Sequence, residues 1–187
     1  MIIDIFQYFN NISPINLEAK TALQEIVRTE KYSKNDVIQQ VGNRCKTLYF
    51  VTDGIARIFY FKDGNDITEH FAFGGNIIIR AESLFTEQPS QKGIQALTDL
   101  SIVAINAQEL FKLFEKFHDV ERLFNKIFIQ EYIATTKRVE SLQFKSAKER
   151  YEELLTQTTL VNQIPLKYIA SYLGITQVSL SRIRTKI

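Results

Sequence analysis

The last stretch of the chain, Gln163–Ile187, reads QIPLKYIASYLGITQVSLSRIRTKI and predicts two short helices joined at a glycine. Pro165 suits the start of the first helix, because its missing N–H costs no hydrogen bond there. Gly174 tolerates the left-handed backbone that commonly ends a helix. Thr176 is then in place to cap the second helix with its side-chain oxygen.

Apolar residues recur at helical spacing in both segments. In the first segment they are Leu166, Ile169, Ala170 and Leu173, and in the second they are Val178, Leu180 and Ile183. Ala170 is small enough to let the second helix approach, and Leu180 is placed to lock the pair. This pattern predicts a helix-turn-helix, in which the second helix crosses the first.

The second helix carries polar and basic side chains and no acid. They are Gln177, Ser179, Ser181, Arg182, Arg184 and Lys186. Gln and Arg can hydrogen-bond the edges of bases, while Ser, Lys and Arg can hold phosphates. A surface helical hairpin with a solvated basic face is the alternative. The absence of Asp and Glu from Gln163 onward favours an element that reads DNA.

Charge is distributed unevenly along the chain of 187 residues, whose net charge is +2. Lys145–Ile187 holds seven basic and three acidic residues, so the first 144 residues are net negative. This pattern is typical of a regulatory domain joined to a nucleic-acid-binding one. The composition, 45% hydrophobic and 24% charged, is that of a soluble globular protein. No apolar run is long enough to span a membrane, so we expect a cytoplasmic protein with no membrane partner.

Few residues could carry chemistry. Cys45 is the only cysteine, which excludes an intrachain disulfide and a multi-cysteine metal site. His70 and His118 are the only histidines. His70 lies in a predicted strand and His118 in a polar break of the long helix, which gives little support to a cupin-type metal site or a paired-His haem. No nucleophile–base pair or phosphate loop is visible. We therefore expect no enzyme, no metal and no cofactor.

The rest of the chain predicts helix, then strands, then helix. Helix is expected up to about Lys31, with Asn16 as a cap. Short strands follow, separated by turns such as Gly42-Asn43, Asp53-Gly54 and the hairpin signal Asp63-Gly64. Strands this short, at this turn frequency, predict a jelly-roll-like barrel or sandwich. The fold class is therefore α+β.

Near Asn106 the apolar period becomes helical and stays so for about forty residues. One interpretation is that this long helix pairs with its twin across a two-fold axis. The other is that Phe111 to Phe128 covers the barrel. The stripe continues to Val139 and Leu142, past the reach of a small barrel, and this favours a homodimer.

Helix, small β-barrel, long helix and helix-turn-helix follow in the order of the Crp/Fnr family of bacterial transcription regulators. The chain resembles that family over nearly its full length. The residues that carry the resemblance are LYFVTDGIARI from Leu48, AKERYEELL from Ala147, and the stretch from Ile164 to Ile187. PLKYIASYLGIT and SLSRIR are similar to short members from Bacteroidetes-type bacteria. The resemblance implies a cyclic-nucleotide-binding-like β-roll sensor at 1–108, a dimerisation helix at 109–144 and a DNA-binding domain at 145–187.

The resemblance further implies that two recognition helices enter successive major grooves of a pseudo-palindromic DNA site. The base-reading positions fall on Gln177, Val178 and Arg182, and the phosphate-contacting ones on Thr176 and Ser179. Val178 stands where the best-known members have an acid, so their half-site is not expected here. RNA polymerase is a further partner that the resemblance suggests.

The expected effector pocket departs from the family pattern. In members that bind cyclic nucleotides, an arginine neutralises the phosphate, and here that position falls on Ser90, with Gln91 beside it. A buried phosphate without a cation is under-compensated, so cyclic AMP is not expected. Arg80, Lys92 and Glu82 are candidates to contact another small-molecule effector.

Ile77–Ile79, Leu84 and Phe85 could line such a pocket or simply fill the core. The β-roll could thus sense an effector or be purely structural in a constitutive regulator. A cyclic-nucleotide-binding module is the third alternative.

Overall fold

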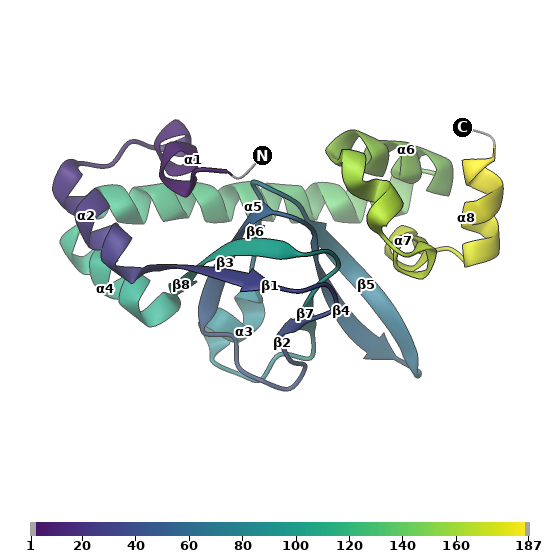
Figure 1. The fold of residues 1–187 in the computed structure, drawn as a ribbon, viewed down its shortest axis with the longest axis horizontal. Helices are drawn as coiled ribbons and strands as arrows, with labels where there is room; N and C mark the ends of the chain where they lie inside the picture. Colours follow the sequence, from purple (N-terminus) through teal and green to yellow (C-terminus); the bar gives the residue numbers. More distant parts are fainter. Residues whose placement is uncertain (1–2, 186–187) are drawn as a thin grey trace.

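Two four-stranded antiparallel sheets form the central part of the molecule in the computed structural model, which describes residues 3–185 (Figure 1). The first sheet has the order β1 (Val27–Tyr32), β8 (Leu100–Asn106), β3 (Thr47–Asp53), β6 (Ile77–Ile78). The second has the order β2 (Val37–Gln39), β7 (Gly93–Ala96), β4 (Ala56–Lys62), β5 (Asn65–Ala72). We call the two sheets, with the short helix α3 (Ala81–Thr86), the β-roll.

The turns that the sequence predicts occur where expected. β4 and β5 pair through a two-residue hairpin whose central residues, Asp63 and Gly64, both have positive φ, 51° and 76°. Two positive φ values define the type I′ turn, which matches the twist of the flanking strands. Gly54 also has positive φ, and a Cβ there would lie 2.4 Å from the backbone oxygen of Asp99. Only glycine fits this tight turn between β3 and β4.

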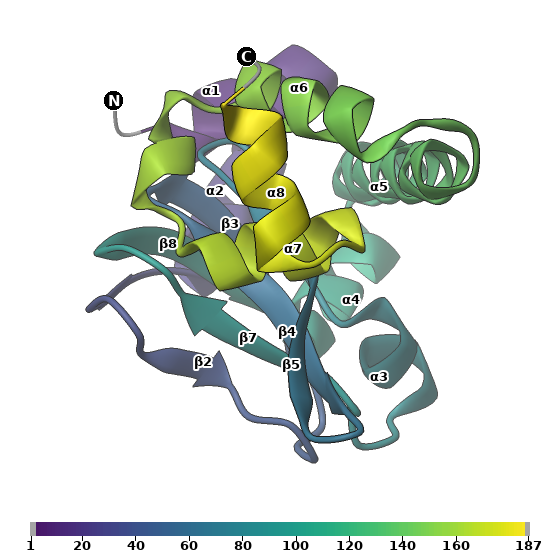
Figure 2. The ribbon, with the colours of Figure 1, turned by 90° about the vertical axis from the view of Figure 1, so that its right-hand side faces the viewer.

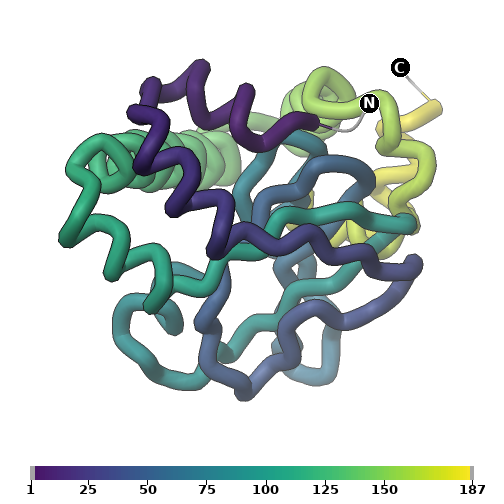
Figure 3. The backbone as a smooth tube through the Cα atoms, turned by 60° about the vertical axis from the view of Figure 1, so that its left-hand side comes forward, coloured from purple at the N-terminus to yellow at the C-terminus, as the bar shows by residue number. Residues whose placement is uncertain are grey.

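Helices cover the outer face of the first sheet. They are α1 (Ile5–Ile12), α2 (Leu17–Ile26), α4 (Ala107–Lys116) and the first half of α5 (His118–Phe144). The Asn16 side chain caps α2 by accepting a hydrogen bond from the Ala19 N–H at 2.9 Å, as predicted. Figure 3 shows α1 beside α5 and α2 leading down into β1. A second apolar layer, built from alternating strand residues, lies between the two sheets.

Two helix boundaries differ from the expectation. The N-terminal helical region ends at Ile26, and residues 27–32 form strand β1, which pairs with β8 from Val27↔Ile105 to Tyr32↔Leu100. The forty-residue helix is two helices, because Phe117 adopts an extended conformation with φ −130° and ψ 91° between α4 and α5. The break lets α4 fold back against α2 while α5 crosses the whole molecule.

The chain ends in a small helical unit, α6 (Ala147–Gln157), a 3-10 turn η1 (Thr159–Gln163), α7 (Leu166–Leu173) and α8 (Gln177–Arg184), which we call the C-terminal unit. A capping box between Ser146 and Glu149 starts α6 directly after α5 ends. Figure 2 shows α7 beside β4 and β5, with α8 in front of it. Mixed helix and sheet, with an N-terminal β-roll, a long helix and a helical C-terminal unit, confirms the predicted fold class.

Candidate DNA-binding and effector sites

The turn between α7 and α8 has the predicted helix-turn-helix geometry. Gly174 ends α7 with φ 69° and ψ 32°, and the Ile175 N–H donates to the Ala170 carbonyl at 3.0 Å. The Thr176 hydroxyl caps α8 by accepting from the Ser179 N–H at 3.2 Å. Leu180 is fully buried and packs α8 against the other helices of the C-terminal unit. Pro165 lies one position earlier than expected, as the residue that precedes α7.

The side chains predicted to contact DNA lie on the open face of α8. Those that the structure describes are all exposed: Thr176, Gln177, Val178, Ser179, Ser181, Arg182 and Arg184. Val178 was expected to lie on the apolar side of the helix, and this is wrong, because its side chain is 62% exposed. Lys186 lies outside the described residues. The Arg184 guanidinium donates to the Asn162 side chain at 3.4 Å, while the Arg182 side chain is exposed to solvent.

A groove of about 1300 Å³ lies under the second half of α5, which we call the α5 groove. Its walls come from β5, β6 and α3 of the β-roll, from α5, and from α6 and α7 of the C-terminal unit. Its charged residues include Glu69, Arg80, Glu82, Glu131, Arg138, Arg150 and Glu153. The groove therefore lies between the β-roll and the C-terminal unit.

The structure brings only some of the predicted effector residues to this groove. Arg80 and Glu82 line it, whereas Ser90, Gln91 and Lys92 do not. Ser90 is buried, and its hydroxyl donates to the Lys92 carbonyl at 2.9 Å. The Lys92 ammonium lies 2.8 Å from the Glu69 carboxylate, which also faces the Arg80 guanidinium at 3.6 Å. Arg80 and Lys92 are thus linked through one shared carboxylate.

The apolar candidates divide between core and groove. Ile77, Ile78, Ile79 and Phe85 line the α5 groove, but Ile77 and Ile78 are almost fully buried and belong to the packed core. Leu84 belongs to the core alone. Phe85 is 55% exposed and stacks with Phe111 at a centroid distance of 6.0 Å. Core filling explains most of this set, and Phe85 is the member that is most open to a ligand.

Three groove residues have perturbed or unusual environments that the sequence did not predict. Burial lowers the pKa of His70 to about 4, an effect to which the nearby charges of Arg138 and Arg80 add. Burial raises the pKa of Glu131 to about 7. Arg138 donates to the Tyr172 carbonyl, and its guanidinium lies 3.8 Å from the centre of the Tyr172 ring. The signal in the sequence was the change of the inward face of α5 from apolar to charged at Glu131.

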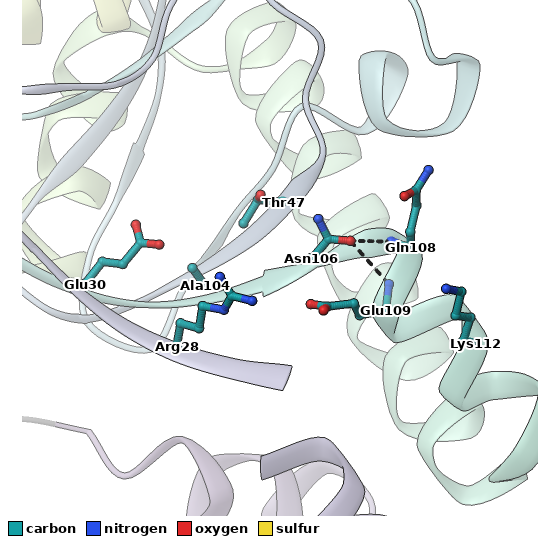
Figure 4. A pocket seen from close by; sticks show the side chains of 8 residues that line it. All are labelled: Arg28, Glu30, Thr47, Ala104, Asn106, Gln108, Glu109 and Lys112. Carbon is teal, nitrogen blue, oxygen red and sulfur yellow. Dashed lines mark hydrogen bonds between the residues drawn. The ribbon is translucent and has the colours of Figure 1, made fainter. Parts of the chain in front are cut away.

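A second, smaller pocket of about 370 Å³ lies where β1, β3 and β8 meet α4 (Figure 4). Asn106 caps α4 there, accepting from the backbone N–H groups of Gln108 at 2.9 Å and Glu109 at 3.2 Å. Two basic side chains, Arg28 and Lys112, balance two acidic ones. None of the predicted site residues lies in this pocket.

Within residues 3–185, no three His, Cys, Asp or Glu side chains are grouped closely enough to hold a metal ion. Cys45 is buried, and its thiol donates to the Thr47 carbonyl at 3.4 Å. None of the helices described is both long enough and apolar enough to cross a membrane.

About half of the chain matches a known sequence family. Residues 29–117 match the sequence family described as cyclic nucleotide-binding domain. No curated protein sequence matches the chain.

Solved structures resemble the chain along most of its length. FixK2 from Bradyrhizobium japonicum has a TM-score of 0.73 and 19% identity, covering 86% of this chain and 84% of its own. A transcriptional regulator of the Crp/Fnr family from Eubacterium rectale has a TM-score of 0.71 and 20% identity, covering 97% of this chain and 86% of its own. CLP, the c-di-GMP-responsive global regulator of Xanthomonas campestris, has a TM-score of 0.69 and 15% identity, covering 91% of each chain. Residues 29–117 are therefore similar to the cyclic nucleotide-binding domain family, and the chain has the fold of the Crp/Fnr transcription regulators among these structures.

Proposed function

We propose that the chain is a sequence-specific, DNA-binding transcription regulator of the Crp/Fnr type that acts as a homodimer. The observation that carries this proposal is the exposed face of α8, which presents Gln177 and Arg182 after a buried helix-turn-helix junction. Within this proposal, residues 1–108 are the sensor, 109–144 the dimerisation helix and 145–187 the DNA-binding domain. RNA polymerase is the partner that a regulator of this type contacts at a promoter.

The homodimer is supported by exposed apolar side chains of α5. Large apolar side chains stand exposed there at spacings of three, four and seven residues: Ile129, Tyr132, Ile133, Val139 and Leu142. Such a stripe is the pattern that a second helix of the same kind covers in a coiled coil. A two-fold axis along α5 brings two copies of α8 to the same side of the dimer, as a pseudo-palindromic site requires.

The effector of the proposed regulator is a small molecule other than cyclic AMP. Ser90 and Gln91, which stand where a phosphate-binding arginine would be expected, lie outside the α5 groove, and the Ser90 hydroxyl is already hydrogen-bonded. A constitutive regulator with a purely structural β-roll, and a module that binds cyclic nucleotides, are the alternatives. A ligand that binds only the folded state must raise the melting temperature. We therefore expect no rise with cyclic AMP, and a rise would favour the cyclic-nucleotide module.

DNA recognition is tested by selecting bound sequences from a random DNA pool with the purified protein. We expect a two-fold symmetric motif whose half-sites lie about 10 base pairs apart, one helical turn. Selection without added ligand and in cell extract separates a constitutive reader from one that needs an effector. A folded protein that enriches no sequence under either condition would refute the proposal.

Arg182→Ala tests the assignment of a base contact. A lost bidentate contact to guanine costs about 1–3 kcal/mol and relaxes the preference at one base pair. Arg122→Ala is the matched control, because it removes the same charge from an exposed position on α5. If Arg182→Ala weakens binding equally for all sequences, Arg182 contacts phosphate and the base-reading assignment is wrong.

A further inference from the structure

The C-terminal unit shares its core with the β-roll. One continuous buried cluster contains Tyr168, Tyr172 and Leu180 of the C-terminal unit together with Phe71 and Leu97 of the β-roll. A domain joined only by a flexible linker would bury its apolar residues within itself. The helix-turn-helix is therefore docked on the sensor-like domain of its own chain, and the contacts at this junction identify the residues that hold it.

Arg57 is the central polar group of the junction. Its side chain is 2% exposed, although it lies on β4 and carries a charge. The guanidinium donates to both carboxylate oxygens of Asp66 at 2.6 and 2.7 Å, to the Gln95 side chain at 3.0 and 2.8 Å, and to the Thr68 hydroxyl at 3.0 Å. Burying a charge is costly unless it is paired and fully hydrogen-bonded, and here every N–H direction is used within the β-roll.

Only the flat faces of the Arg57 guanidinium remain for further contact. Its central carbon lies 4.6 Å from the centre of the Phe59 ring on β4 and 3.6 Å from the centre of the Tyr168 ring on α7. Stacking of a guanidinium on an aromatic face is favourable, and more so when water is excluded. The β-roll thus orients the guanidinium by hydrogen bonds at its edges and presents it to a ring of the C-terminal unit.

Two more contacts lie on the same face of α7. Residues 168, 171 and 172 share one face because side chains three and four positions apart are neighbours on a helix. The Ser171 hydroxyl accepts from the backbone N–H of Thr68 at 3.0 Å, and the Tyr172 ring lies 4.8 Å from the Phe71 ring. β5 is the outer strand of its sheet. The helix therefore covers a sheet edge whose backbone groups would otherwise need water.

The end of α7 is held from the other side by two arginines. Arg138 of α5 donates to the Tyr172 carbonyl, and Arg150 of α6 donates to the Leu173 carbonyl at 2.7 Å. Basic side chains commonly satisfy the last carbonyls of a helix in this way. Since only three residues separate α7 from α8, and Leu180 packs α8 against α7, the orientation of α8 follows that of α7.

We propose that Arg57 is a positioning residue for DNA recognition, holding α7 on the β-roll through Tyr168 and thereby setting the orientation of α8. The docked arrangement leaves Gln177, Val178 and Arg182 exposed, as contact with DNA requires. This inference rests on the proposed function. A dimer with two docked units presents two recognition helices at a fixed separation, whereas undocked units present them at many separations.

The test uses Tyr168→Leu in the full chain, because this change removes the stacking partner and leaves the Arg57 network of the β-roll intact. Binding is measured to a single half-site and to two half-sites at several separations around one helical turn. We expect the variant to bind the single half-site like the wild type, to bind the best palindrome about tenfold more weakly, and to lose its preference for one separation. Tyr60→Leu is the control, since Tyr60 lies on β4 and contacts Lys92 rather than α7.

Docking itself is measured without DNA by hydrogen exchange of the Thr68 amide in Ser171→Ala and in Tyr168→Leu. We expect exchange at this amide to become faster in both variants and to stay unchanged in Tyr60→Leu. An unchanged separation profile in Tyr168→Leu, or tighter binding to the palindrome, would overturn the positioning role. If the wild type binds no DNA while the Thr68 amide is protected, the proposed function fails and the docking contact alone remains.

Discussion

The inward face of α5 contacts the packed core in its first half and lines the α5 groove in its second half. In the first half, the inward residues Val120, Leu123, Phe124 and Ile127 are at most 1% exposed and form the core over the first sheet. In the second half, the inward residues are Glu131, Arg138 and Ser141, which line the α5 groove. The spacing of three, four and seven residues continues without a break, so one helix face changes from core to groove wall.

The inward face of the second half of α5 carries charged side chains. A helix that only needed to cover the β-roll would remain apolar on its inner face, because burying an unpaired charge is costly. Glu131 and Arg138 instead face the junction of the β-roll with the C-terminal unit. The first half packs the helix against the β-roll, and the second half places charged side chains along the groove.

The largest expected effect lies in the first half. Phe124 is fully buried, and its ring centre lies 5.6 Å from that of Phe9 and 5.8 Å from that of Phe114. We expect Phe124→Ala to lower the free energy of unfolding by about 3–5 kcal/mol, because it removes a buried ring and leaves a cavity. Urea denaturation measures this change, and the exposed neighbour Arg122→Ala should stay within about 0.5 kcal/mol. A small loss in Phe124→Ala would show that the first half is not a fixed core element.

Local signals predicted the parts of the fold that depend on local geometry. Asp63-Gly64 predicted the hairpin because a type I′ turn needs two residues that accept positive φ. Gly174, Thr176 and Asn16 predicted helix ends because each satisfies specific backbone groups. Each of these features depends on a few neighbouring residues, so it can be predicted without knowing any distant contact.

Features that depend on distant contacts were missed. Residues 27–32 read VRTEKY, a polar segment that becomes a strand because β8 offers it a complete backbone pairing. The groove residues His70 and Arg138 come together only when β5 and α5 are placed side by side. The contacts of Tyr168 with Arg57 and of Tyr172 with Phe71 depend on how the C-terminal unit docks on the β-roll, so the neighbouring sequence does not predict them.

Glu131 is a titratable side chain at the start of the second half of α5. Burial raises the pKa of Glu131 to about 7, from an ordinary value of 4.5, so between these pH values the folded state binds more protons than the unfolded state. The contribution of Glu131 to stability is therefore fully present below pH 4.5 and is lost as the pH rises through 7. We expect Glu131→Gln to remove this loss and to be more stable than the wild type by about 2–3 kcal/mol at pH 8.

Urea denaturation of the two proteins between pH 4 and pH 8 measures this difference. His70 contributes the opposite slope, because its folded-state pKa is lowered to about 4 and stability is lost as the pH falls from 6.5. The difference in free energy of unfolding between the Glu131→Gln variant and the wild type isolates the contribution of Glu131. A difference that does not grow with pH would mean that Glu131 is solvated and that the inner face of the second half is not a buried groove wall.

The smallest effect on the stability of the single chain is expected at an exposed apolar side chain of the second half, Tyr132. Tyr132 is 74% exposed, so its loss removes little buried area within one chain. At low protein concentration we expect Tyr132→Ala to change the free energy of unfolding by less than about 0.5 kcal/mol. In a homodimer that buries Tyr132, the melting temperature of the wild type should rise with protein concentration, and that of the variant should rise less.

Gln130→Ala, at an exposed polar position of the same helix, is the control for this concentration series. Mass measurement by light scattering on the same samples reports the oligomeric state directly. A wild type whose melting temperature is independent of concentration and whose mass is that of one chain would leave the exposed apolar side chains of α5 without their proposed partner. The two halves of the helix would then differ only on their inner face, and the α5 groove would have to act on the docked C-terminal unit of a single chain.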